Sequence, residues 1–350
     1  MHWAEPRRRI RMGKCMGKAK NNNRIAVILS ATLLPAVFLL SFFVGKYNID
    51  WSQIFTEGTM DNRVFVYLRT GRSLMVMFAG IGLGMAGYTF QNVFRNPLAS
   101  PDVAGVASGA GVGAAAAMTC GAGIASAIPG IAGFGVISLA ALLGGMAALS
   151  LVLLLTRLSG RSGTVTLLLS GIIVNAVFQA LLMIIKMYAD SEKTLESIEF
   201  WLMGSFSDVT LTAFLKIIIW LGLGIGGMLL MSRRIILLSL PDDEAQMLGI
   251  NVKRTRILAL AAATLATASV ICVTGIIAFI GLLAPHIARR IDIRGGIVLS
   301  GATGAFLLLV SDILVRIIGS SELPISVVTS LTGAPLLFFL VLRERGKLKH

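Results

Sequence analysis

Long apolar runs constrain the fold of this chain more than any other feature. Most of them approach or exceed the roughly 20 residues that an α-helix needs to cross a bilayer. Charged residues make up only 14% of the 350 residues, whereas a soluble domain carries about a quarter. We therefore expect an all-α polytopic membrane protein with about ten transmembrane helices in contact with membrane lipid. The apolar runs lie near residues 25–44, 64–90, 102–119, 131–156, 164–187, 211–231, 257–274, 276–288, 297–315 and 324–342.

Two of these runs, 102–119 and 276–288, are short, and each lies beside a break rich in Gly and Pro. Irregular backbone at membrane depth is tolerated only where protein or a water-filled cavity covers it. One or both runs are therefore candidates for partial helices that line the interior of the protein.

The distribution of Lys and Arg predicts the topology, because cytoplasmic segments carry an excess of basic residues. Most of the 31 basic residues fall in the two tails and in the loops near 91–101, 157–163, 232–256 and 289–296. We therefore expect both termini to be cytoplasmic, in the cell (plasma or inner) membrane. The net charge of +14 then reflects attraction to anionic headgroups rather than nucleic acid. The predicted division is a basic tail at 1–24, one transmembrane domain at 25–343 with a cytoplasmic loop at 232–256, and a tail at 344–350.

Three arginines are expected on the opposite, acid-rich side of the membrane. Arg69 and Arg72 are three residues apart at the start of the second run, so they share a helix face. Arg316 ends the ninth run on the same side. One interpretation is that the three side chains snorkel to lipid headgroups. The alternative is a basic surface that binds an acidic partner.

The loop at 232–256 is the longest predicted cytoplasmic connection. Pro241, followed by three acidic residues that end at Glu244, is typical of a helix N-terminus. Gly249 is typical of a helix end. This pattern predicts a short amphipathic helix at the membrane surface, which either stands alone or docks a cytoplasmic protein.

A polar turn, Gln91 to Pro101, separates the second and third runs, and its prolines end the helices on both sides. Gly105, Gly109 and Gly113 follow at four-residue spacing. Small residues at that spacing let helix backbones approach closely in lipid. The glycines either only pack helices together or form part of a hairpin that shifts as a gate.

Several long segments resemble one family in the right order. They are "RTGRSLMVMFAGIGLGMAGYTFQNVFRNPLASPDVAGVASGAGVG", "FWLMGSF", "DDEAQMLGINV", "GIIAFIGLLAPHIARR" and "ELPISVVTSLTGAPLLFFLVLR". The chain resembles the FecCD-type permeases, the transmembrane subunits of ABC importers for iron-siderophores, haem and cobalamin. It departs from the family pattern in two places. Thr70-Gly71 stands between the first arginines where the family has a Pro, and "IDIRGG" shortens a loop.

The resemblance implies a FecCD/cobalamin-importer-type permease fold. It also implies a homodimer with the substrate path along its axis, two ABC ATPase subunits on the cytoplasmic side, and a substrate-binding protein outside. This chain would then be no enzyme and bind no cofactor or metal, because the ATPase uses the ATP. The implied roles are binding-protein docking for Arg69, Arg72 and Arg316, ATPase coupling for Glu244, Ala245, Leu248 and Gly249, and a cytoplasmic gate for Asn96, Leu98 and Thr164.

Alternatives remain open at this stage. Ferric siderophore is the expected substrate, with cobalamin or haem as the alternative. An ion-coupled secondary transporter is a second class, although no carboxylate lies in the middle of a run, where coupling ions usually need one. A membrane-embedded enzyme is a third class, but no run carries paired carboxylates, a His cluster or a nucleophile arrangement.

Overall fold

The structure is a computed structural model that describes residues 32–45, 47–127, 134–160, 163–189, 192–292, 296–318 and 323–347. The basic tail and the first residues of the first predicted run lie outside this range, as do the last three residues. The described chain is helical, and no strand occurs in it. Its elements are a helix at Thr32–Phe43, α2 (Met60–Arg63), the π-helix η1 (Val64–Thr70), α3 (Gly71–Phe94), α4 (Val106–Ala127), α5 (Phe134–Leu158), α6 (Thr164–Met187), α7 (Glu192–Leu202), α8 (Leu211–Leu230), α9 (Ser232–Leu237), α10 (Asp242–Met247), α11 (Val252–Thr274), α12 (Ile280–Ile291), α13 (Gly296–Ile318) and α14 (Ile325–Lys347).

Each of the ten predicted runs contains a helix, which confirms the predicted polytopic all-α fold. Six helices within the described residues are long and apolar enough to cross a membrane, and three shorter apolar helices accompany them at Thr32–Phe43, Val106–Cys120 and Ile325–Phe339. Of the two runs expected to be short, only one is a partial helix. α4 has 22 residues, whereas α12 has 12 residues.

A non-helical stretch at 275–279 explains why α12 is short. Gly275 ends α11 with φ +71°, in the left-handed region that favours glycine. A Cβ there would lie 2.0 Å from the carbonyl oxygen of Trp201. The Ser326 hydroxyl donates to the carbonyl of Ile276 at 2.7 Å and accepts from the N–H of Ala278 at 3.3 Å. Neighbouring protein therefore satisfies backbone groups that the break leaves free, as a membrane interior requires.

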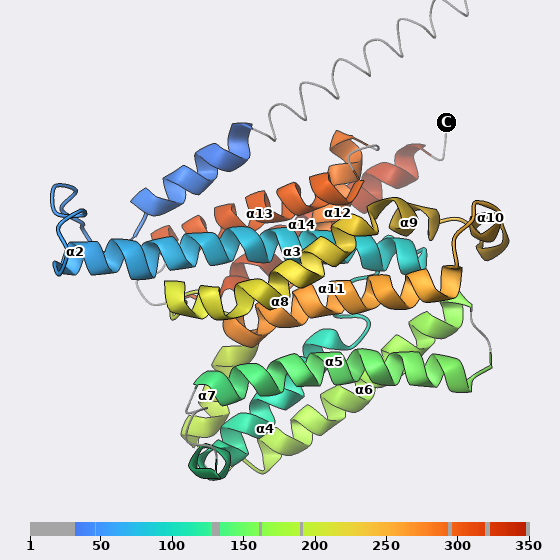
Figure 1. Ribbon diagram of the computed structural model, residues 1–350, viewed down its shortest axis with the longest axis horizontal. Coiled ribbons are helices and arrows are strands. Elements are labelled where there is room, and N and C mark those ends of the chain that lie inside the picture. Colours follow the sequence, from blue (N-terminus) through green and yellow to red (C-terminus); the bar gives the residue numbers. More distant parts are fainter. Residues whose placement is uncertain are drawn as a thin grey trace, which may run out of the picture.

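α3 is the buried centre of the molecule (Figure 1). It packs against α12 and α13 on one side and against α8 and α11 on the other. α4, α5 and α6 form a further group that joins the centre mainly through α11. The two ends of α3 therefore lie at opposite ends of the bundle, and both carry predicted site residues.

Glycines bring the helix backbones together at two places. A Cβ at Gly84 in α3 would lie 2.3 Å from the Ser300 carbonyl oxygen of α13. A Cβ at Gly113 in α4 would lie 2.1 Å from the Ala140 carbonyl oxygen of α5. The close packing predicted for Gly113 is confirmed, and Gly84 packs in the same way, because no other residue fits at either position without moving a backbone.

Candidate functional site

One end of the bundle carries a buried charge cluster that joins α3 and α13. Arg72 donates from Nε and Nη2 to Oδ1 of Asp312, at 2.9 and 2.8 Å. Arg316 donates to the other carboxylate oxygen of Asp312 and also to the backbone carbonyls of Ser41 and Val44. Asp312 is fully buried. Asp312 is therefore paired with two arginines from its own chain.

Arg69 lies beside this cluster, in the π-helix η1. It is 7% exposed and donates to the carbonyl of Phe42 at 2.8 Å and to that of Tyr47. Arg69 therefore holds the end of the helix Thr32–Phe43 against the rest of the bundle.

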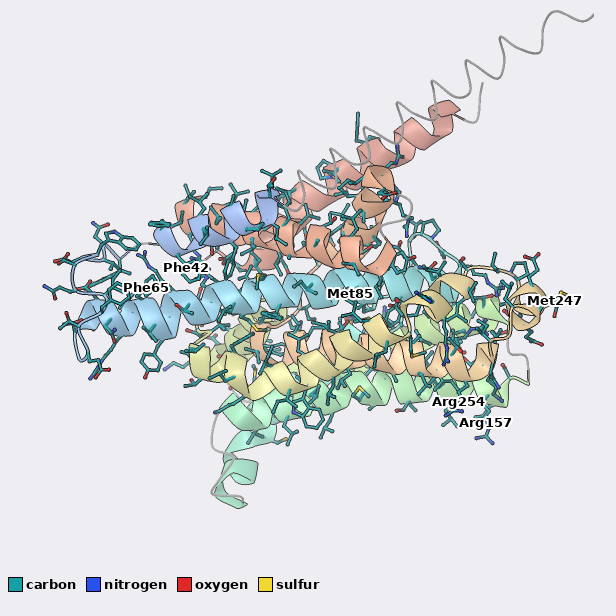
Figure 2. All side chains as sticks on the ribbon, turned by 45° about the horizontal axis from the view of Figure 1, so that its top comes forward. Phe42, Phe65, Met85, Arg157, Met247 and Arg254 are labelled. Atoms are coloured by element: carbon teal, nitrogen blue, oxygen red, sulfur yellow. The ribbon has the colours of Figure 1, made fainter. Side chains whose placement is uncertain are left out.

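The three predicted outer arginines thus meet at one place. Together they line a pocket of about 210 Å³ at this end of the bundle. The structure places them largely within the protein, on partners from their own chain, rather than on a freely exposed face. The side chain of Arg72 is the most accessible within the cluster, at 18% exposed against 7% for Arg316. Figure 2 shows Phe42 and Phe65 at this end and Met247 at the other.

The short helix predicted from Pro241 to Gly249 is present as α10, at the opposite end of the bundle. Pro241 precedes it, three acidic residues form its first turn, and Gly249 follows it with φ +83°. Ala245 is fully buried, whereas Glu244 is exposed. Met247 is 86% exposed and Leu248 58%, and Figure 2 shows Met247 at the outer edge of the helix.

Asp242, the first residue of α10, joins three segments. Its Oδ1 accepts from Arg95, which directly follows α3, and from Arg256 of α11 at 3.0 Å. Arg95 also donates to the Leu238 carbonyl at 3.0 Å. Arg95 adopts φ 49°, which is left-handed and unusual for a residue other than glycine. Sequence reasoning identified Asp242 only as a helix-start acid and missed these contacts. The signal available was the position of Arg95, directly before the predicted gate residues.

The turn after Arg95 holds the first two predicted gate residues. The Asn96 side chain accepts a hydrogen bond from the Leu98 N–H at 2.9 Å, and Leu98 is 51% exposed. Thr164 is half-buried at the start of α6. Among the described residues, no hydrogen bond joins Thr164 to the turn.

The chain beyond this turn packs against α6. A Cβ at Gly171 in α6 would lie 3.2 Å from the Cα of Ala104, and a Cβ at Gly105 would lie 3.3 Å from the backbone nitrogen of Asn175. α6 also carries Gln179, which is exposed among apolar neighbours such as Val177 and Leu181. An amide that faces hydrocarbon is costly. Asn175 and Gln179 are polar residues within an apolar run of the sequence. Sequence reasoning did not use them as a signal that this face of α6 is not covered by lipid.

Comparison with known proteins decides the family, because residues 33–343 match the FecCD transport family. The chain belongs to the FecCD transport family. A probable iron chelatin transport system permease protein of Helicobacter pylori is 35% identical over 81% of this chain and 83% of its own. A hemin transport system permease protein of Yersinia pestis is 31% identical over 89% of this chain and 94% of its own.

A solved structure supports the same conclusion. It is described as an inward-facing conformation of a putative metal-chelate type ABC transporter, and its TM-score is 0.80 at 30% identity. The match covers 91% of this chain and 99% of that chain. This FecCD protein is therefore a multi-pass membrane permease of the ABC transporter class, which sets aside the ion-coupled transporter and the membrane-embedded enzyme. Within the described residues, no group of three or more His, Cys, Asp or Glu side chains is placed to hold a metal ion.

Proposed function

We propose that this permease forms the translocation path for a ferric siderophore. The observation that carries the proposal is the family match, together with relatives whose names specify an iron chelatin and hemin. Hemin is accordingly the nearest alternative substrate, and cobalamin is the other substrate that the sequence resemblance implies. The chain itself would bind no cofactor, and a separate ATPase would hydrolyse the ATP.

The working unit that we propose is a homodimer with two ATPase subunits at the α10 end. A substrate-binding protein would dock at the Asp312 end. The proposed orientation places α10 and both termini in the cytoplasm, because the basic loops gather at the α10 end. Arg157 and Arg254 lie at that end of the bundle (Figure 2).

The exposed side chains of α10 support ATPase docking there. Met247 and Leu248 are large apolar residues that stand out from the end of the bundle. Apolar side chains in such a position are typical of contact sites for a partner. Ala245 is buried and Gly249 has a left-handed backbone, so these two residues shape the helix rather than contact the ATPase. We propose that Glu244, Met247 and Leu248 contact the ATPase, and that Ala245 and Gly249 set the shape of α10.

The arginine pocket supports docking of an acidic partner. Arg72 and Arg316 share a single carboxylate, Asp312, and Arg69 donates to backbone carbonyls, so the pocket keeps a positive charge. We propose that an acidic side chain of the binding protein approaches Arg72, the most accessible of the cluster. Charge complementarity of this kind speeds encounter and selects the partner more than it adds affinity.

The substrate path is proposed to run between two copies of α6 and of the turn that contains Asn96 and Leu98. Gln179 supports this placement, because its exposed amide would face a partner subunit or an aqueous path rather than lipid. The packing of residues 104–105 on α6 connects this face to the turn. Leu98 would narrow the path at its cytoplasmic end, and Thr164 would lie at the foot of the same helix.

Uptake by the reconstituted transporter tests the proposed substrate. Proteoliposomes would hold the permease and its ATPase, with ATP inside and the binding protein outside. Labelled ferric siderophore, haem and cobalamin would be compared at equal concentration. We expect ATP-dependent accumulation of the ferric siderophore. Accumulation of haem or cobalamin alone would contradict the substrate assignment while leaving the permease assignment intact.

A further inference from the structure

A pocket at the α10 end lies between three helices and has no role in transport as described above. It has a volume of about 360 Å³. Its wall is formed by apolar side chains of α5, α6 and α11, and every charged residue in its lining is basic. The lining residues are Leu153, Leu154, Leu167, Ile257, Arg157, Lys253 and Arg256, with Thr156 and Gly160.

The charges of this pocket are of one sign. Arg157 and Lys253 are exposed, and neither forms an ion pair with another described residue. Arg256 is largely buried and shares Asp242 with Arg95. The Asp242 carboxylate is already paired with Arg95 and Arg256. It therefore does not compensate the charges of Arg157 and Lys253 at the mouth of the pocket.

The arrangement of the walls matches an amphiphile. Leu154 is 49% exposed and Ile257 is 39% exposed, on helices that are long and apolar enough to span a membrane. Arg157 lies one turn beyond Leu153 and Leu154, towards the end of α5. A basic mouth above an apolar groove between membrane helices fits an anionic headgroup with an acyl chain below it.

We propose that this pocket binds one anionic phospholipid per subunit. Arg157 and Lys253 hold its phosphate, Arg256 forms the deep edge, and one acyl chain lies along Leu153, Leu154 and Ile257. Because Arg256 also contacts Asp242, the bound lipid lies next to the ion pair of Asp242 with Arg95, which connects α10 to α3. The proposal depends on membrane insertion, which the family establishes, and not on which substrate the permease carries.

Lipid retention measures the proposed site without using transport. The full-length chain would be placed in nanodiscs of phosphatidylcholine with a minority of phosphatidylglycerol. It would then be extracted into detergent and examined by native mass spectrometry. We expect one phosphatidylglycerol per subunit to be retained in preference to phosphatidylcholine. The double variant Arg157→Ala, Lys253→Ala should weaken that retention by roughly thirtyfold, since each basic side chain near a membrane surface contributes about a fivefold attraction.

A matched control is available on α9. Arg233 and Arg234 are exposed and do not line the pocket, so Arg233→Ala, Arg234→Ala removes the same charge elsewhere and should leave retention unchanged. Lys253→Arg keeps the charge and should retain the lipid, which separates lost binding from lost folding. Equal loss in both double variants, or no preference for phosphatidylglycerol in the unaltered chain, would overturn the proposal. Displacement of the lipid by soluble glycerol phosphate would overturn the part that requires an acyl chain.

Discussion

The Asp242 carboxylate and the Arg95 guanidinium form an ion pair that joins the start of α10 to the end of α3. Asn96 and Leu98 follow Arg95 directly in the chain. A displacement of α10 therefore has a short covalent and ionic connection to the turn that we propose as the gate. Arg256 shares the same carboxylate, so α11 is part of the connection.

Replacement of Asp242 tests this connection. Asp242→Asn removes the negative charge that Arg95 and Arg256 share. The side chains of Asp242 and Arg95 are 34% and 25% exposed, so the loss of this pair should cost near the 0–1 kcal/mol typical of an accessible pair. Arg256 is 9% exposed, so the loss of its partner should add to that cost. ATP-driven uptake should fall by roughly 5- to 150-fold, the range of a coupling free energy of about 1–3 kcal/mol.

The neighbouring Asp243 supplies the control for that experiment. It is exposed on the same helix, and Asp243→Asn removes an equal charge without changing the ion pairs of Asp242. Uptake and ATPase activity would be measured together in proteoliposomes. Normal uptake by Asp242→Asn, or equal loss in both variants, would show that the ion pair does not transmit the movement.

Met247 should be a major contact for the ATPase. Met247→Asp places a charge where the partner is expected to bury an apolar side chain, and such contacts are worth about 2 kcal/mol or more, or about thirtyfold in affinity. Met60, which is 67% exposed in α2 at the other end, provides the matched control Met60→Asp. Co-purification of the ATPase with each variant measures the effect. Full association of Met247→Asp would place the docking site elsewhere.

Arg72 should contribute to the rate at which the binding protein associates. Arg72→Ala removes the most accessible charge of the pocket and leaves the pair of Arg316 with Asp312. The association rate on nanodisc-embedded permease should fall, and its salt dependence should weaken, because salt screens the long-range attraction of exposed charges beyond about 10 Å at 0.1 M. Reversal of Arg316 is unsuitable, since Arg316→Glu would put a second carboxylate beside Asp312. An unchanged rate and salt dependence for Arg72→Ala would contradict docking at this pocket.

Gly84 should be intolerant of any side chain. Gly84→Val would drive a Cβ against the Ser300 carbonyl, where the space is 2.3 Å. Overpacking of this kind costs about 1–3 kcal/mol. Gly222 of α8 has open space around its position, so Gly222→Val is the control. The midpoint of thermal unfolding in detergent would be compared, and equal midpoints for the two variants would refute the close α3–α13 contact.

Much of this fold was predictable, because a membrane-spanning helix requires a long run of apolar residues that is visible in the sequence. The apolar runs located every long helix, and Pro241 and Gly249 predicted α10 through local backbone chemistry. The distribution of Lys and Arg predicted which loops lie at the same end of the bundle, and the ion pairs of Arg95 and Arg256 with Asp242 agree. α7 was not predicted, because its eleven residues carry charges and lie between two apolar runs.

The pairings were less predictable, since they depend on tertiary contacts between distant parts of the chain. Asp312 meets Arg72 across 240 positions in sequence, and no local pattern encodes that contact. Arg69, Arg72 and Arg316 were predicted to share a side and do so, but their burial on partners from their own chain was not foreseen. Family resemblance supplied the roles of Asn96, Leu98 and Thr164, which remain predictions.

The distance between the two Leu98 residues of the proposed dimer tests whether α10 drives a gate at this turn. Spin labels at Leu98→Cys would be measured in nanodiscs with the ATPase, without nucleotide and with ATP trapped. We expect the labels to lie close together in one state and to move apart in the other, and we expect Asp242→Asn to abolish this change. Labels that stay far apart in every state, or that move equally when Asp242 is replaced, would contradict a gate at this turn driven through α10.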